Sequence, residues 1–235
     1  MTTIVHSSSA RSTGFNAAFT WVLPLLFSAA LVIGTLEFAA RGTHTMVAHT
    51  LSELFYAPGG FALFPAAAIL LAGSILGWAW ALFRRQLPRT AAVAAVGGIG
   101  LLIAAIFPTD PSATEVLSWS AQIHRYAAAV MFIFVPLAGL AHLRSAQLRT
   151  GPRRIIFGAV VLSALGALPA IGGRLESLMP PGVWSDLFGG FAAACGLVER
   201  IQLLLVIAII AASTQALMQP SDVRETAPLA VHKQQ

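Results

Sequence analysis

An aspartate and a histidine at the facing ends of two consecutive apolar segments are well suited to chemistry. Asp110 follows the apolar run that ends at Phe107, and His124 opens the next run. An imidazole beside a carboxylate can act as a general acid or base, and both groups can ligate a metal. The alternative is local structure, because residues 108–111 read Pro-Thr-Asp-Pro, which is turn chemistry. His124 and Arg125 could likewise anchor a helix at a membrane interface.

A second set of candidates lies in the segment THTMVAHTLSELFY, residues 43–56. If this segment is helical, His49 and Glu53 share a face, with Ser52 beside them, and could ligate a metal or hold a head group. Thr50 and Glu53 also have the spacing of a capping box, which would make them purely structural. The candidate ligands for a divalent metal are therefore His49, Glu53, Asp110 and His124, although the chain lacks a compact signature such as His-Glu-x-x-His.

Charged residues at the ends of apolar runs form the third set. Glu37 and Arg41 are spaced i, i+4, so they could pair and anchor a helix at the interface, or Glu37 could belong to a functional site. Glu199 and Arg200 are adjacent, and adjacent helical residues point about 100° apart, so each should find a partner on another helix. The candidate catalytic residues are His124 and Asp110, and the candidate ligand-binding residues are Glu37, Ser52, Glu53, Glu199 and Arg200.

Six apolar runs must position these side chains. A helix that crosses a hydrocarbon core of about 30 Å needs about 20 apolar residues, and 57% of this chain is hydrophobic and only 10% charged. Backbone polar groups in lipid must be satisfied within the span, and the runs lack strand-like alternation. The sequence therefore predicts an all-α polytopic membrane protein with a six-helix transmembrane bundle over residues 19–217. The expected spans are Phe19–Ala40, Phe61–Phe83, Ala91–Phe107, Ala127–Leu143, Ile155–Ile171 and Leu187–Leu217. Residues 1–18 and 218–235 are expected to be disordered tails.

The basic residues predict the orientation. With both termini inside, the inner loops and tails hold Arg11, Arg84, Arg85, Arg89, Arg144, Arg149, Arg153, Arg154, Arg224 and Lys233, and the outer side holds Arg41, Arg125, Arg174 and Arg200. By the positive-inside rule both termini are cytoplasmic (N-in/C-in), in an inner membrane. The net charge of +5 then reflects topology and contact with anionic lipids, and nucleic acid is not needed to explain it.

Most acidic residues and half of the histidines fall on the opposite, outer side. They are Glu37, Glu53, Asp110, Glu115, Glu176, Asp186 and Glu199, with His44, His49 and His124. We therefore expect a polar cluster at the outer face. In the third run, Gly97, Gly98 and Gly100 would allow close helix packing, either within the chain or between subunits. The start of the last run, at 188–197, could be a re-entrant segment instead of part of a span.

Four short motifs carry a family resemblance. The motifs are Leu51-Ser52-Glu53-Leu54, Phe107-Pro108-Thr109-Asp110, His124 at the start of a span, and Gly196-Leu197-Val198-Glu199-Arg200-Ile201. In this order, they resemble the bacterial integral-membrane family catalogued as domain of unknown function 998. The resemblance covers about residues 20–217 and implies a six-helix inner-membrane protein without an established reaction. It suggests that Ser52, Glu53, Asp110, His124, Glu199 and Arg200 belong together. Phe55-Tyr56 departs from the family, where a small residue is expected.

Two functions are compatible with these residues. The first is a non-enzymatic membrane protein whose outer cluster binds a lipid head group or a small polar ligand. The alternative is an intramembrane hydrolase or transferase that acts on lipid through His124 and Asp110, with or without a metal. A carrier is disfavoured, because the chain shows no inverted repeat and no charge near a bilayer midplane.

Overall fold

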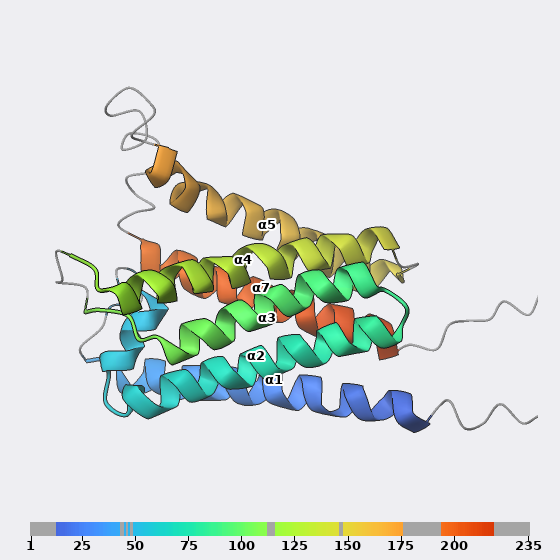
Figure 1. Cartoon of the computed structure of the whole chain (residues 1–235), viewed down its shortest axis with the longest axis horizontal. Helices are drawn as coiled ribbons and strands as arrows, with labels where there is room; N and C mark the ends of the chain where they lie inside the picture. Colours follow the sequence, from blue (N-terminus) through green and yellow to red (C-terminus); the bar gives the residue numbers. More distant parts are fainter. Residues whose placement is uncertain are drawn as a thin grey trace, which may run out of the picture.

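Six long α-helices and one short 3-10 helix make up the described part of the chain (Figure 1). The computed structural model describes residues 13–42, 45, 47, 49–111, 116–145, 148–175 and 194–218. In order, the elements are α1 (Thr13–Ala39), η2 (Leu51–Tyr56), α2 (Gly60–Arg84), α3 (Pro88–Ile106), α4 (Trp119–Ser145), α5 (Thr150–Leu175) and α7 (Cys195–Met218). No strand occurs in these residues. The all-α prediction is confirmed.

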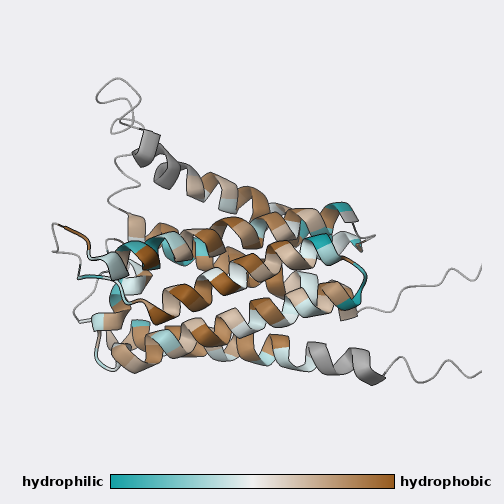
Figure 2. Cartoon of the chain, viewed as in Figure 1, coloured by the Kyte–Doolittle hydropathy of each residue, from teal (hydrophilic) through white to brown (hydrophobic). Residues whose placement is uncertain are grey.

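Five of the helices are long and apolar enough to cross a membrane. They are α1, α2, α3, α4 and α7, and their mean hydropathy is 1.9 to 2.1 over the best window. Figure 2 shows apolar residues along the lengths of the helices and polar residues mainly near their ends. The chain is therefore a multi-pass membrane protein. The sixth expected span, Ile155–Ile171, lies in α5, and its crossing of the membrane stays a prediction.

Several helix boundaries differ from those predicted. α1 begins at Thr13, before the predicted run, and α4 begins at Trp119, earlier than the predicted Ala127. The polar residues of the first turns of α4 explain this difference, because a helix extends beyond its apolar stretch where its polar end reaches the interface. α7 begins at Cys195. The segment 187–193, the suggested re-entrant stretch and both terminal tails lie largely or wholly outside the described residues.

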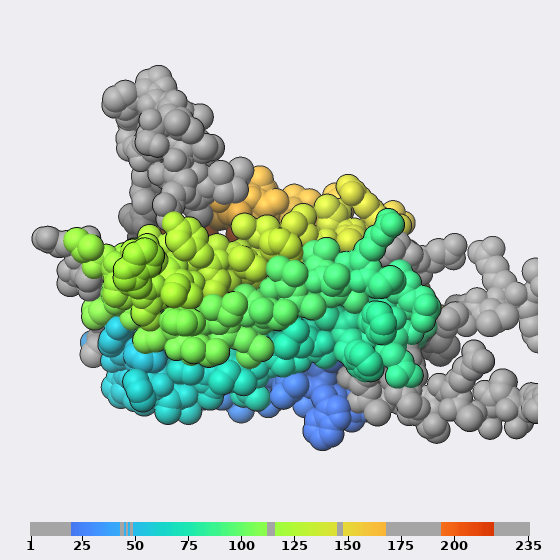
Figure 3. Space-filling view, viewed as in Figure 1, coloured from blue at the N-terminus to red at the C-terminus, as the bar shows by residue number. Residues whose placement is uncertain are grey.

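Helix α7 is the centre of the bundle. Consecutive helices α1 to α4 pack against each other, and α7 contacts α1, α2, α4, α5 and η2. Figure 3 shows the face on which α2, α3 and α4 lie side by side. Trp78, Val206 and Ile209 are completely buried in the core. Because α7 contacts most of the other elements, groups at its ends can tie several of them together.

The glycines of α3 allow close packing within the chain. A Cβ on Gly100 would lie 2.8 Å from the Ala127 carbonyl oxygen of α4. A Cβ on Gly98 would lie 2.8 Å from the Leu76 side chain of α2. Contacts between helices of one chain are therefore sufficient to explain this stripe of small residues.

The turn between α2 and α3 ends α2 with a Schellman motif. Gln86 has a φ of 61°, in the left-handed region where glycine is usual. The Leu87 amide donates to the Leu82 carbonyl (3.1 Å) and the Gln86 amide to the Phe83 carbonyl (3.0 Å). The Arg85 side chain donates to the Leu217 carbonyl near the end of α7. This turn and the end of α7 therefore meet, at the end of the bundle opposite to η2 (Figure 1).

Candidate functional site

The segment before η2 is bound to the first turn of α7. The first amide groups of a helix have no partner within it, and here the Gly196 and Leu197 amides both donate to the Val47 carbonyl, at 3.0 and 3.3 Å. A Cβ on Gly196 would lie only 2.0 Å from the His49 carbonyl oxygen. The α1–α2 loop can approach α7 this closely only because residue 196 is glycine.

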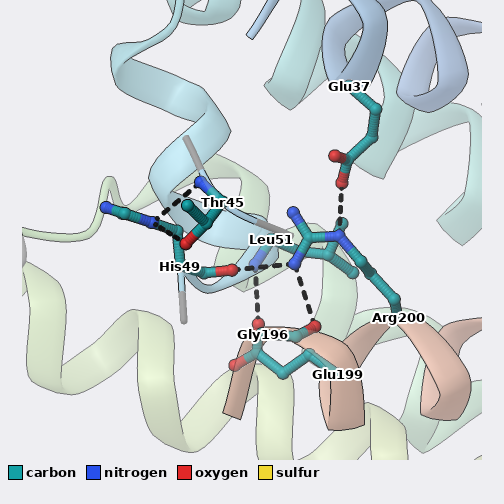
Figure 4. A network of polar contacts seen from close by, with 7 residues as sticks. All are labelled: Glu37, Thr45, His49, Leu51, Gly196, Glu199 and Arg200. Carbon is teal, nitrogen blue, oxygen red and sulfur yellow. Dashed lines mark hydrogen bonds and ion pairs between the residues drawn. The ribbon is translucent and has the colours of Figure 1, made fainter. Parts of the chain in front are cut away.

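Arg200 joins three separate parts of the chain, as Figure 4 shows. Its Nε donates to Glu37 Oε1 of α1 (2.7 Å), and its Nη1 donates to the carbonyls of His49 (2.7 Å) and Gly196 (2.9 Å). The side chains of Arg200 and Glu37 are only 13% and 14% exposed. Charge-assisted bonds of this length are among the strong ones in proteins. Arg200 therefore fixes the loop against both α1 and α7.

The pairing of Glu37 with Arg41 suggested by their spacing does not form. The Arg41 guanidinium lies over the Phe38 ring, 4.8 Å from its centroid, on an exposed part of the chain. Glu37 instead forms its ion pair with Arg200, 163 residues away. The predicted Glu37–Arg41 pair was therefore wrong, because the fold places the guanidinium of Arg200, which is more buried than that of Arg41, beside Glu37.

Glu199 and Glu53 are two acidic groups without a guanidinium at ion-pair distance in the described residues. Glu199 Oε2 accepts a hydrogen bond from the Leu51 amide of η2 at 2.8 Å. Glu53 is 9% exposed, and its buried Oε2 has no hydrogen-bond partner. Glu199 is attracted by Arg200 and, more weakly, by Arg125 of α4, without a direct bond to either, and it is repelled by Glu53. An unpartnered buried carboxylate carries a desolvation cost.

His49 and Ser52 do not join Glu53 on one helical face. η2 begins only at Leu51, and Thr50 before it is extended, so His49 lies outside the helix. The His49 ring nitrogen Nδ1 accepts from the Thr45 amide at 3.1 Å. The Ser52 hydroxyl contacts the Thr50 hydroxyl at 3.1 Å, and Thr50 makes no side-chain capping bond. The capping-box interpretation was therefore wrong, since backbone bonds alone close this short helix.

Asp110 organises the start of α4. Its Oδ2 accepts from the Ser118 amide (2.6 Å) and its Oδ1 from the Ser118 hydroxyl (2.8 Å). The Ser118 hydroxyl oxygen in turn accepts from the Ala121 amide at 3.1 Å, which is the geometry of a helix N-cap. Both oxygens of Asp110 therefore have a structural partner.

His124 caps the other helix of the same turn. Its Nδ1 lies 2.8 Å from the Ala104 carbonyl and 2.9 Å from the Phe107 carbonyl, at the end of α3. Because both partners are acceptors, Nδ1 carries the proton and donates. Asp110 and His124 make no hydrogen bond with each other in the described structure. The two side chains therefore have different partners here, and their catalytic role stays a prediction.

Tyr56 connects η2 to this turn. Its hydroxyl donates to the Thr109 carbonyl at 2.6 Å. Partial burial, and then the negative charge of Asp110, raise the pKa of the Tyr56 hydroxyl. Phe55 packs edge-on against Phe61 at 5.3 Å between ring centroids. The two aromatic residues that depart from the family pattern thus hold η2 in place.

The predicted site residues therefore fall into two groups at one end of the bundle. Glu37, Glu53, Glu199 and Arg200 gather where the α1–α2 loop meets α7, and we call them the acidic cluster. Asp110 and His124 stabilise the α3–α4 turn. No three His, Cys, Asp or Glu side chains of the described residues converge on a metal position, and metal binding stays a prediction. His44, Glu115, Glu176 and Asp186 lie outside the described residues.

Sequence reasoning missed the roles of three residues that hold these groups in place. Gly196 allows the His49 carbonyl to lie beside α7, Ser118 binds Asp110, and Tyr56 donates to the Thr109 carbonyl. Ser118 had a usable signal, because a serine just before a helix is a common N-cap. Nothing in the local sequence distinguishes Gly196 from the other glycines, since its constraint comes from a loop far away in the chain.

Comparison with known protein families shows which family the chain belongs to. No curated protein and no solved structure matches the chain significantly. The family model described as "Protein of unknown function (DUF998)" matches residues 21–216. This match runs from α1 to the last turn of α7 and includes all residues of the acidic cluster. The chain therefore belongs to the DUF998 family.

Proposed function

We propose that this protein binds a small polar molecule or a lipid head group at the outer end of its helix bundle, through Glu53 and Glu199. The buried Glu53 carboxylate carries this proposal, because its Oε2 has no hydrogen-bond partner in the described structure. Leaving a buried charged group without a partner costs several kcal/mol. A bound molecule that supplies the missing partner would offset this cost.

Glu37 and Arg200 have a positioning role in this proposal. Arg200 Nε and Nη1 already donate within the chain, to Glu37 and to two backbone carbonyls. The pair holds the α1–α2 loop on α7, and the Glu199–Leu51 bond holds the start of η2. Because Glu53 lies on η2, the same contacts determine where its carboxylate lies relative to Glu199.

The proposed orientation has both termini in the cytoplasm and the acidic cluster outside, at an inner membrane. The excess of arginine in the turn after α2 and in the segment between α4 and α5 supports it. The start of α1 and the end of α7 also lie at the same end of the bundle (Figure 1). Reporter fusions after Arg89 and after Gln235 should both read cytoplasmic, and a periplasmic result for both would reverse the orientation.

Mass spectrometry of the purified protein tests the binding function. Wild-type protein is extracted in a mild detergent, and the molecules that remain bound are released and identified. Glu53→Gln should lose the bound species. Arg41→Met is the matched control, because it removes an exposed charge near the same loop but leaves η2 and both carboxylates intact, and it should retain the bound species. If wild type and Glu53→Gln release the same molecules in the same amounts, the proposed function is wrong.

A further inference from the structure

The acidic cluster has more negative than positive charge. Glu37 is neutralised by Arg200 at 2.7 Å. Glu199 accepts a hydrogen bond from a neutral backbone amide, and it is attracted without a direct bond by Arg200 and, more weakly, by Arg125, an exposed residue of α4. Glu53 Oε2 has no hydrogen-bond partner in the described structure. Among the described residues, these three carboxylates thus face two guanidinium groups, those of Arg200 and Arg125, which leaves an excess of one negative charge.

The uncompensated charge lies at Glu53 and Glu199, which interact electrostatically with each other. Glu53 is buried on η2, and Glu199 is half-buried in the first turns of α7. An ionised carboxylate only accepts hydrogen bonds. An occupant that satisfies this pair must therefore donate hydrogen bonds, and a positive charge would strengthen each of them.

We infer that the occupant carries a protonated primary amine, whose ammonium group donates to Glu53 and Glu199. This inference rests on the proposed function and names the chemical class of its ligand. A primary ammonium has three donors and no acceptor, which fits two carboxylates that interact with each other, with Glu199 bonded to the Leu51 amide two residues before Glu53. A phosphate or carboxylate group would be repelled by the same pair. A quaternary ammonium would bring the charge but no donor.

The position of the pair indicates two sources for such an amine. Glu53 lies on the loop between α1 and α2, and Glu199 lies close to the start of the spanning helix α7. Both are therefore at the level of lipid head groups. The ammonium group can belong to the ethanolamine head group of a lipid or to a small amine in solution, and the chemistry of binding is the same for both.

The experiment uses the full chain in bilayer discs of phosphatidylcholine. Phosphatidylethanolamine or phosphatidylglycerol with the same acyl chains is added, and retained lipid is measured by native mass spectrometry. We expect at least a tenfold preference for phosphatidylethanolamine, because a charge-assisted hydrogen bond in a desolvated place is worth about that factor. Glu53→Gln and Glu199→Gln should each remove the preference, and Arg41→Met, which changes an exposed residue outside η2, should keep it. Ethanolamine in solution should displace the lipid if the site also admits free amines.

A thermal measurement separates ligand binding from folding. Wild-type protein in detergent should melt at a higher temperature when ethanolamine is added, and Glu53→Gln should lose this shift. Without ligand, Glu53→Gln should be at least as stable as wild type, because it removes an uncompensated charge. If phosphatidylglycerol is retained as well as phosphatidylethanolamine but both depend on Glu53, the amine inference is wrong and the proposed function stands. If neither lipid nor amine depends on Glu53, both are wrong.

Discussion

Arg200→Met should be the most destabilising single substitution at the η2 end of the bundle. The guanidinium makes three charge-assisted bonds, to Glu37 at 2.7 Å, to His49 at 2.7 Å and to Gly196 at 2.9 Å. Methionine has a similar length but no donor, so Glu37, with a side chain only 14% exposed, would lose its cation. Removing one partner of a buried pair costs about 3–5 kcal/mol. We expect the free energy of unfolding to fall by this amount.

A second substitution should restore part of this loss. Glu37→Gln alone keeps an acceptor for Arg200 but loses the charge, which should cost about 1–2 kcal/mol. In the Arg200→Met background, the same change removes an uncompensated buried carboxylate. The double variant should therefore be more stable than Arg200→Met alone, by about 1–2 kcal/mol.

Unfolding in mixed micelles, followed by circular dichroism, measures these free energies. Arg41→Met is the matched control, because it removes an exposed arginine four residues from Glu37, and it should cost at most about 0.5 kcal/mol. An equal loss for Arg41→Met and Arg200→Met would refute the reasoning. So would additive losses in the double variant, since additivity means that Glu37 and Arg200 do not interact.

Three further predictions concern the loop contacts at the η2 end and the turn between α2 and α3. Gly196→Ala should lower the free energy of unfolding by about 2 kcal/mol or more, because the new Cβ would lie 2.0 Å from a backbone oxygen. In the same unfolding assay, Gly34→Ala should be neutral or stabilising, because nothing lies within 4 Å of its Cβ position. Gln86→Gly should raise the free energy of unfolding by about 1 kcal/mol, because residue 86 has a φ of 61°; an unchanged or lower value would contradict the helix-end assignment. The raised pKa of Tyr56 means that its contribution to stability is complete below about pH 10 and is lost as the pH rises through the folded-state pKa. The melting temperature of wild type should therefore fall more steeply above about pH 10 than that of Tyr56→Phe, and parallel curves would exclude this contribution.

The motifs pointed to residues that lie together at the η2 end of the bundle, but not to the contacts that these residues make. Phe107-Pro108-Thr109-Asp110 and His124 had two explanations, chemistry and turn structure, and the contacts of Asp110 with Ser118 and of His124 with the end of α3 are those of a structural turn. The residue types alone could not decide this. A carboxylate and an imidazole can bond each other or the backbone, and only their positions select the partner.

The sequence by itself determined the membrane class, the helical fold and the approximate limits of most helices. These properties depend on local composition, because every stretch of about 20 apolar residues must satisfy its own backbone in lipid. Only the tertiary structure decided which charges meet. Glu37 had a possible partner four residues away, but the docking of α7 against α1 brought a better-buried guanidinium to it from 163 residues away. Such pairings depend on how whole helices pack, and no local pattern in the sequence records this.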